Sequence, residues 1–370
     1  MQRKGTDIII KKWSVGWGIT SECNMHCQFC YSKSTRKALD DLALCDWKRF
    51  VDENAKQIDS INYGTGENAI HDDWFELVKY INDNYKEIKQ ALTTNGFLFK
   101  RIQSNDAFRE IVNKAIAEID ISLDFANPER HNLFRGNPNA FSWATSLLEY
   151  CQANNIVATI VFIGTNETLD IENLRGLFAI AKKYGANLRM NIYRPTEGIN
   201  SIAEKFIADY EVILRALSYI NDHYKILAID DPLFAALMTD QHKSMDPSGE
   251  NSIRVLPDGS ITPSTYLIEK EFRCRNIKED KVLETITFDD SPFERVIPEE
   301  CTDCQYVKMC EGGVLDRRYL WYRDFKERDP YCPFRHTEYG EDIPSVKIYH
   351  PETEFSSVHH GYLATMFFTN

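Results

Sequence analysis

Three cysteines stand close together near the start of the chain, in Thr20-Ser21-Glu22-Cys23-Asn24-Met25-His26-Cys27-Gln28-Phe29-Cys30-Tyr31. Three thiolates at this spacing can ligate three irons of a cubane [4Fe–4S] cluster. The fourth iron then has no protein ligand and stays open to a small molecule. The spacing therefore predicts a cluster that can bind and reduce a substrate.

Two other interpretations fit these cysteines less well. A zinc site usually takes four ligands, often in C-x2-C pairs, and His26 between two ligating thiols would seldom reach the same metal. A disulfide framework disagrees with the composition, because the chain has only 10 cysteines in 370 residues and no apolar signal segment at its start.

The pattern C-x3-C-x-Φ-C, with Phe29 as Φ, resembles the signature of the radical S-adenosylmethionine (SAM) superfamily. In that family the open iron chelates the amino and carboxylate groups of SAM. An electron from the cluster then cleaves SAM to methionine and a 5′-deoxyadenosyl radical. The resemblance implies a SAM-binding [4Fe–4S] cluster on Cys23, Cys27 and Cys30, and a reductant of the ferredoxin or flavodoxin type.

The composition argues against two other classes of partner, nucleic acid and membrane. The net charge of −13 disfavours nucleic acid, whose affinity comes mainly from lysine and arginine. No apolar run approaches the ~18 residues that cross a membrane. With no signal peptide at the start, we expect a cytoplasmic protein in a reducing compartment and no membrane partner.

Short apolar runs alternate with helical patterns, which predicts an α/β fold. The expected strands are residues 14–20, 60–63, 90–94, 118–123, 157–163 and 187–193, and the expected helices are residues 47–57, 74–85, 106–115, 141–154 and 171–184. Six such repeats imply a parallel sheet with right-handed crossovers. The arrangement matches the partial (β/α)6 TIM-type barrel of radical SAM enzymes, in which ligands gather at the carboxyl ends of the strands.

Several motifs follow these strands, and the resemblance assigns them to SAM. Gly64-Thr65-Gly66-Glu67 resembles the family's GGE motif, with Thr65 in place of the second glycine and Asn68 where proline often follows. The glycines would let the backbone approach the ligand, and backbone groups or the acid would hold its amino group. A glycine-rich turn with a solvated glutamate is the alternative.

Further SAM contacts are expected from the next loops. Ser122 and Asp124 match the family's S-x-D, which contacts the ribose and methionine part of SAM, and Asn95 stands at a position often close to SAM. Arg135 resembles an arginine that pairs with the SAM carboxylate in some relatives, although a surface arginine is the alternative. Tyr31 is expected near the adenine, whereas Trp13, Trp17 and Trp47 are expected in the core.

A second group of cysteines, Cys301, Cys304, Cys310 and Cys332, can fully ligate another [4Fe–4S] cluster. Its spacing resembles the SPASM extension of peptide-modifying radical SAM enzymes. Full SPASM domains hold two auxiliary clusters, but Ser264 and Val314 replace two of the cysteines that the other cluster would need. We therefore expect a single auxiliary cluster, with a structural zinc site as the alternative.

The resemblance and the composition together give a division of the chain. We expect an N-terminal extension (1–13), the radical SAM partial barrel (14–225), a cysteine-rich SPASM-like iron–sulfur domain (226–340) and a C-terminal tail (341–370). Residues 252–265 predict a hairpin that opens the extension, and a helix over 202–224 is expected to link it to the barrel. The last thirty or so residues resemble nothing familiar.

The predicted function is radical modification of a ribosomally made precursor peptide, as in RiPP biosynthesis, by epimerisation, crosslinking or backbone excision. Only about 13 residues precede the first strand, which leaves no room for a winged-helix recognition domain, so a small separate protein is expected to present the peptide. A radical SAM dehydrogenase or mutase acting on a small molecule and a non-catalytic iron–sulfur protein are the alternatives.

The sequence assigns no catalytic acid, base or hydrogen donor. Asp230, Asp231 and Asp316 lie in suitable regions, and Cys274 stands alone between the two cysteine groups. Cys45 and Cys151 fall within helical patterns and are expected to be small buried apolar residues.

Overall fold

One sheet of eleven strands organises the computed structural model, which describes residues 10–35, 40–239, 245–335, 343–351 and 355–370. Its strands are β1 (Trp13–Trp17), β2 (Ile58–Tyr63), β3 (Lys89–Thr94), β4 (Glu118–Ser122), β5 (Val157–Gly164), β6 (Asn187–Ile192), β7 (Lys225–Ile229), β8 (Ser252–Val255), β9 (Ser260–Thr262), β10 (Arg275–Asn276) and β11 (Met366–Thr369). Their order across the sheet is β10-β9-β8-β1-β2-β3-β4-β5-β6-β11-β7. Neighbours from β1 to β6 pair in parallel, which confirms the predicted parallel sheet.

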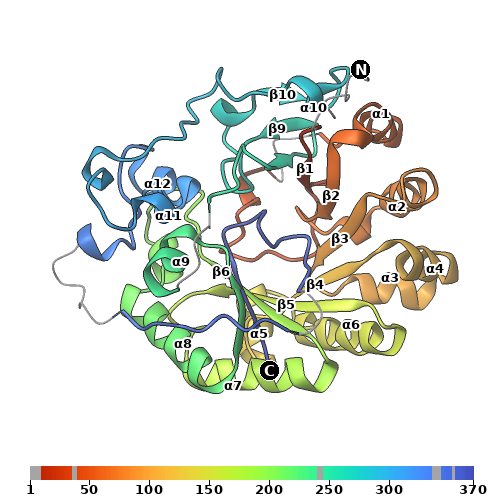
Figure 1. Cartoon of the computed structure of the whole chain (residues 1–370). Coiled ribbons are helices and arrows are strands. Elements are labelled where there is room, and N and C mark those ends of the chain that lie inside the picture. The colour runs from red at the N-terminus through yellow and green to blue at the C-terminus, as the bar shows by residue number, and fades with distance from the viewer. Residues whose placement is uncertain (1–9, 36–39, 240–244, 336–342, 352–354) are drawn as a thin grey trace, which may run out of the picture.

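Helices surround the curved sheet on its outer side, so that the strands form a partial barrel (Figure 1). Their bounds are α1 (Leu44–Asn54), α2 (Asp72–Asn84), α3 (Leu98–Ser104), α4 (Asp106–Ala115), α5 (Pro128–Arg135), α6 (Ala140–Asn154), α7 (Ile171–Tyr184), α8 (Tyr210–His223), α9 (Pro232–Met238), α10 (Val282–Thr285), α11 (Val307–Cys310) and α12 (Leu315–Tyr322). The parallel strands require these crossovers, since no tight turn can join them. The α/β partial-barrel prediction is thereby confirmed.

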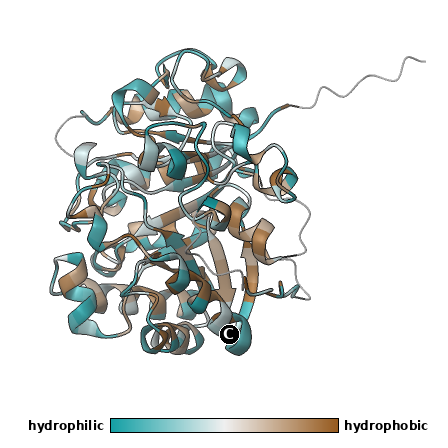
Figure 2. Cartoon of the chain, turned by 90° about the vertical axis from the view of Figure 1, so that its left-hand side faces the viewer, coloured by the Kyte–Doolittle hydropathy of each residue, from teal (hydrophilic) through white to brown (hydrophobic). Residues whose placement is uncertain are grey.

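The core lies between the strands and the helices. Successive side chains on a strand alternate between faces, and on β4 Ile119 and Ile121 join the apolar core. Trp13, Trp17 and Trp47 are also fully buried there, as predicted. In Figure 2 the central strands are largely brown, whereas the surrounding helices and loops carry much teal. Burial of this apolar layer fixes which face of each strand points into the barrel.

Two segments from the C-terminal half complete the sheet. The predicted hairpin is confirmed as β8 and β9, which pair antiparallel, and β8 also pairs in parallel with β1. Strand β11 lies antiparallel between β6 and β7. Figure 1 shows this C-terminal segment, in dark blue, crossing the middle of the barrel. Neither β7 nor β11 was expected from the sequence.

Three local predictions were wrong. The helix expected over residues 202–224 begins only at Tyr210 and leads directly into β7. The helix expected over residues 74–85 begins two residues earlier, at Asp72, whose carboxylate pairs with Arg101. Cys45 is exposed on α1, whereas Cys151 is buried as predicted.

Among the described residues, no helix has both the length and the apolar character needed to cross a membrane.

Candidate functional site

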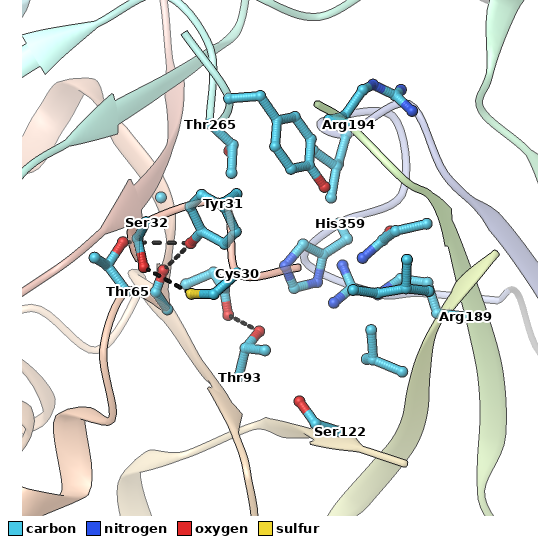
Figure 3. A pocket seen from close by; sticks show the side chains of 18 of the residues that line it. Cys30, Tyr31, Ser32, Thr65, Thr93, Ser122, Arg189, Arg194, Thr265 and His359 are labelled. Carbon is cyan, nitrogen blue, oxygen red and sulfur yellow. Dashed lines mark hydrogen bonds between the residues drawn. The ribbon is translucent and has the colours of Figure 1, made fainter. Parts of the chain in front are cut away.

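A cavity of about 200 Å³ opens at the carboxyl ends of the barrel strands. Ten of the residues predicted for the site line it: Cys23, Cys27, Cys30, Tyr31, Gly64, Thr65, Gly66, Asn95, Ser122 and Arg135. They come from loops separated by more than a hundred residues and meet because parallel strands end at one rim. Figure 3 shows Cys30, Tyr31, Thr65 and Ser122 around this space. The two other predicted residues, Glu67 and Asp124, are buried behind its wall.

The loop that carries the first three cysteines packs in an apolar cluster. Met25, Cys27 and Phe29 are buried against Tyr193 and Phe206, and Phe29 also stacks on Phe134 with ring centroids 4.3 Å apart. All three thiols line the same cavity, and no fourth cysteine does so among the described residues. His26 is exposed and does not line the cavity. Three sulfur donors within an apolar shell fit a [4Fe–4S] cluster with one open iron.

Gly66 brings the second motif against the cysteine loop. Its φ is +63°, and a Cβ built on it would lie 2.3 Å from the carbonyl oxygen of Glu22. The neighbouring Glu67 amide donates to that same oxygen at 2.8 Å. A residue other than glycine would therefore separate the two loops.

Glu67 holds in place the loop after β3, which forms part of the cavity wall. Its carboxylate accepts hydrogen bonds from the Thr94 hydroxyl at 2.8 Å and the Asn95 amide at 2.8 Å. Burial raises the pKa of Glu67 to about 7, although these hydrogen bonds oppose the shift. The side chain thus fixes the loop after β3, and its predicted contact with SAM stays a prediction.

The raised pKa of Glu67 predicts a pH-dependent stability. Its pKa rises from 4.5 to about 7 on folding, so between these values the folded state binds more protons and its stability falls as pH rises. The contribution is ~3 kcal/mol across the window. Denaturant unfolding at both ends of the window should show that Glu67→Gln removes this part of the slope. Parallel pH profiles for the parent and the variant would contradict the assignment.

Asn95 and Arg135 are held at the cavity by hydrogen bonds. The Asn95 side-chain amide donates to Asn24 Oδ1 at 2.8 Å and lies 3.7 Å from the Cys23 sulfur. Arg135 Nε donates to Asp124 Oδ2 at 2.6 Å, and its backbone carbonyl lies 3.6 Å from the Cys27 sulfur. Asp124 therefore orients Arg135 rather than facing the cavity itself.

Tyr31 links the cysteine loop to the glycine motif. Its hydroxyl donates to the Gly64 carbonyl at 2.6 Å, and its ring meets Tyr266 edge-on with centroids 5.5 Å apart. An aromatic ring at this position can contact a planar base, as the prediction for adenine requires.

Sequence reasoning missed a set of basic residues that line the cavity, here called the basic wall. It consists of Arg189 on β6, Arg194 after β6, Arg254 on β8 and His359 from the C-terminal segment. A charged residue between two apolar neighbours in a strand was the available signal for Arg189 and Arg254. His359 had no such signal, because only the pairing of β11 brings it into the barrel.

A second, small apolar pocket collects the other four predicted metal ligands. Cys301, Cys304, Cys310 and Cys332 line it together with Leu233 and other apolar residues. Burial raises the pKa of the Cys310 thiol above its usual range and that of Cys332 to about 11. A metal ligand must be a thiolate, so metal binding at these four sulfurs would release their protons. Four sulfur donors fit either a fully ligated [4Fe–4S] cluster or zinc.

The loop between these cysteines depends on Gly313. Its φ is +94°, and a Cβ there would lie 2.3 Å from the Asp329 Cβ. The Gly313 amide donates to the Cys310 carbonyl at 2.8 Å, and the Cys332 amide donates to the Asp329 carbonyl at 3.0 Å. Asp329 thus brings the last two cysteines to the same pocket.

Ser264 and Val314, which stand where a second auxiliary cluster would need cysteines, make other contacts. The Ser264 hydroxyl donates to Asp316 Oδ2 at 2.6 Å, and Asp316 Oδ1 accepts from Arg194 at 2.9 Å. Val314 is fully buried in the core. Cys274 donates to the Phe272 carbonyl and lies outside both pockets. Neither position therefore offers a sulfur ligand, and the expected single auxiliary cluster stays a prediction.

The three candidate acids also have structural partners. Asp230 accepts from the Gly361 amide at 3.0 Å, and Asp231 caps α9. Like Asp316, neither of them lines the cavity.

Comparison with known proteins agrees with this geometry. A model described as the Radical SAM superfamily matches residues 17–178. The AdoMet-dependent heme synthase of Methanosarcina barkeri is 28% identical, with 87% of this chain and 96% of that protein covered. The mycofactocin maturase MftC of Mycobacterium tuberculosis is 24% identical, with 87% and 83% covered. The fold is similar to Streptococcus suis SuiB bound to precursor peptide SuiA, with a TM-score of 0.69, 18% identity, and 87% and 76% covered.

Proposed function

We propose that this chain, which belongs to the radical SAM superfamily, takes a hydrogen atom from a precursor peptide and so installs a modification in it. The observation that carries the proposal is the shared cavity: three cysteine thiols, a glycine motif and polar residues from four strand ends all open into it. When bound, a [4Fe–4S] cluster and SAM would supply the reductive cleavage that starts radical chemistry at a C–H bond.

The chain's own residues would prepare the site in three ways. Cys23, Cys27 and Cys30 would hold the cluster, and the packing of Phe29 on Phe134 keeps water from its apolar side. Arg135, fixed by Asp124, would pair with the SAM carboxylate. Gly64, Thr65, Gly66, Asn95, Ser122 and Tyr31 would surround the remainder of SAM, with Glu67 holding the loop that carries Asn95.

The peptide as substrate is supported by the relatives. MftC is a maturase, and SuiB, whose fold this chain shares, binds a precursor peptide. A small separate protein would present the peptide, and a ferredoxin or flavodoxin would supply the electron. Product analysis would identify the modification as epimerisation, a crosslink or backbone excision.

We also propose that Cys301, Cys304, Cys310 and Cys332 hold a single auxiliary [4Fe–4S] cluster. Because four sulfurs satisfy all four irons, this cluster would transfer electrons or stabilise the extension rather than bind substrate. Zinc at the same four thiols would make the site structural.

Anaerobic reconstitution tests these proposals together. We expect about eight irons per chain, as two [4Fe–4S] clusters require, and 5′-deoxyadenosine when SAM and dithionite are added. About four irons with one zinc would retain the SAM-binding site but contradict the auxiliary cluster. Eight irons without 5′-deoxyadenosine, even with the precursor peptide present, would contradict the enzymatic proposal.

A second candidate is radical chemistry on a small molecule. It is favoured by the basic wall, which offers polar contacts inside the barrel, and by the similarity to a heme synthase. Extract from the native host can distinguish the two candidate functions. The extract is first filtered through a membrane that retains peptides and passes small molecules. A peptide substrate predicts that the retained fraction stimulates 5′-deoxyadenosine formation, and a small substrate predicts that the filtrate does.

A further inference from the structure

Three cationic or potentially cationic side chains converge inside the barrel. Arg189, Arg254 and His359 all line the cavity and are 2%, 1% and 6% exposed. Figure 3 shows Arg189 beside His359, across the open space from Cys30 and Thr65. Burial lowers the pKa of His359, and the nearby charges of Arg189 and Arg254 lower it further, whereas Asp120 opposes the shift. The three side chains therefore line one cavity and are close enough for their charges to interact.

The nearby carboxylates do not provide hydrogen-bond acceptors for all the N–H groups of these three side chains. Arg189 Nη2 donates to Asp120 Oδ2 at 3.0 Å, and His359 Nδ1 lies 3.0 Å from the same oxygen. Two further nitrogens of Arg189, Nε and Nη1, are buried without a hydrogen-bond partner among the described residues. The nearby Glu118 bonds instead to Ser357 and to the Val358 amide, and burial raises its pKa to about 7.

Arg254 is the least compensated of these charges. In the described part of the chain it makes no ion pair with a carboxylate: it donates to the Gly64 carbonyl and to the Tyr31 hydroxyl, while its Nε has no partner. Arg194, which lines the same cavity, is by contrast neutralised by Asp316 at 2.9 Å. An unpaired guanidinium in a buried site costs several kcal/mol, and buried charges are normally paired.

Oxyanions match what this site offers. A guanidinium presents its N–H groups in a planar fork that binds a carboxylate or a phosphate through two hydrogen bonds. Two such forks and an imidazole provide more donors than Asp120 can accept from. We propose that Arg189, Arg254 and His359 form a subsite for an oxyanion of the substrate, a carboxylate or a phosphate, held inside the barrel. This inference rests on the proposed function and names the substrate's chemistry.

Thermal unfolding of the reconstituted, SAM-loaded protein tests the subsite. Millimolar phosphate or propionate should raise the midpoint relative to chloride at equal ionic strength, because a ligand that binds only the folded state stabilises it. Propionamide, which lacks the charge, should not. Phosphate or propionate acting alone identifies which oxyanion the subsite takes, and no shift with either one overturns the proposal.

Variants separate a binding role from a structural one. Arg254→Met leaves no carboxylate unpaired, so it should fold, unfold at a higher temperature without added anion, and lose the anion response. Arg189→Lys keeps the pair with Asp120 but loses the fork, and should reduce the response several-fold. Arg175→Gln, on the exposed face of α7, should leave the response unchanged. A lower midpoint for Arg254→Met with the full anion response would show a structural role and overturn the proposal.

SAM also carries a carboxylate, so its affinity must be measured in the same variants. We expect the SAM dissociation constant of Arg189→Lys to stay within about threefold of the parent, a difference below 1 kcal/mol. A tenfold or greater weakening would assign the subsite to SAM and overturn the inference about the substrate. The 5′-deoxyadenosine assay stands apart from both measurements, so failure of the proposed function and failure of this inference are distinguishable.

Discussion

Replacing Cys27 with alanine should reduce SAM-dependent 5′-deoxyadenosine formation to background. Cys27 is buried in the apolar cluster with Met25 and Phe29, where water cannot substitute for a lost thiolate. One iron of the cluster would then have no protein ligand. Changes to residues that only support a metal ligand cost about 10–100-fold, so loss of a ligand itself should cost more than ~100-fold. The measurement is 5′-deoxyadenosine released by the reconstituted variant with SAM and dithionite.

Cys45→Ala is the matched control for this variant. Cys45 is an exposed cysteine on α1, so its loss should leave both iron content and activity unchanged. Circular dichroism of both variants should match the parent, because removing one sulfur leaves the helices and strands intact. 5′-deoxyadenosine formed by Cys27→Ala at the parent rate would overturn the assignment of the cluster ligands.

The first six strands were predictable because each makes a local pattern. Strand β5, for example, is an apolar run of β-branched residues followed by the polar start of α7, where the Asp170 side chain accepts from the Glu172 and Asn173 amides. Gly185 then ends that helix with a φ of +65°. Such signals lie within a few residues of the element they define.

The pairing of the strands that extend the barrel sheet could not be predicted, because it does not depend on a local pattern. Strand β11 is a short segment at the end of the chain, and it becomes a strand because it fills the place between β6 and β7. Strand β8 was predicted as part of a hairpin, but its pairing with β1, across more than two hundred residues of sequence, was not. Pairing at such distance depends on the assembled fold rather than on local propensity.

The same distinction applies to the candidate site. The cysteine loop and the glycine motif carry their chemistry in contiguous residues, so their meeting followed from the parallel topology. Arg254 and His359 enter the cavity only through β8 and the C-terminal segment, and neither position has a motif. Glu67 belongs to the glycine motif, but its hydrogen-bond partners Thr94 and Asn95 lie at the end of β3. These hydrogen bonds hold its side chain behind the cavity wall.

The substitution with the largest expected effect on stability is Arg317→Met. Arg317 is fully buried and donates to Asp231 at 2.6 Å and to Asp329 at 2.6 Å. Methionine would leave two buried carboxylates without their counter-charge, which costs about 3–5 kcal/mol when a buried pair is broken. Denaturant unfolding of the reconstituted protein measures this loss.

The variant should also lose the auxiliary metal site selectively. Asp231 caps α9, whose Leu233 and Leu237 line the four-cysteine pocket, and the Asp329 carbonyl holds the Cys332 amide. With Arg317 gone, α9 and the Cys332 loop lose their common partner, so iron content should fall by about four per chain, one cluster's worth. Cys23, Cys27 and Cys30 share none of these contacts, and 5′-deoxyadenosine formation should persist in the protein that remains folded.

Arg323→Met provides the control from the end of the same helix. Arg323 is half-exposed and pairs with Glu269 at 2.7 Å, and surface pairs of this kind contribute no more than ~1 kcal/mol. Its iron content should therefore equal that of the parent. If Arg317→Met also kept its full iron content and unfolded within ~1 kcal/mol of the parent, the buried ion-pair network would not be what holds the four cysteines together.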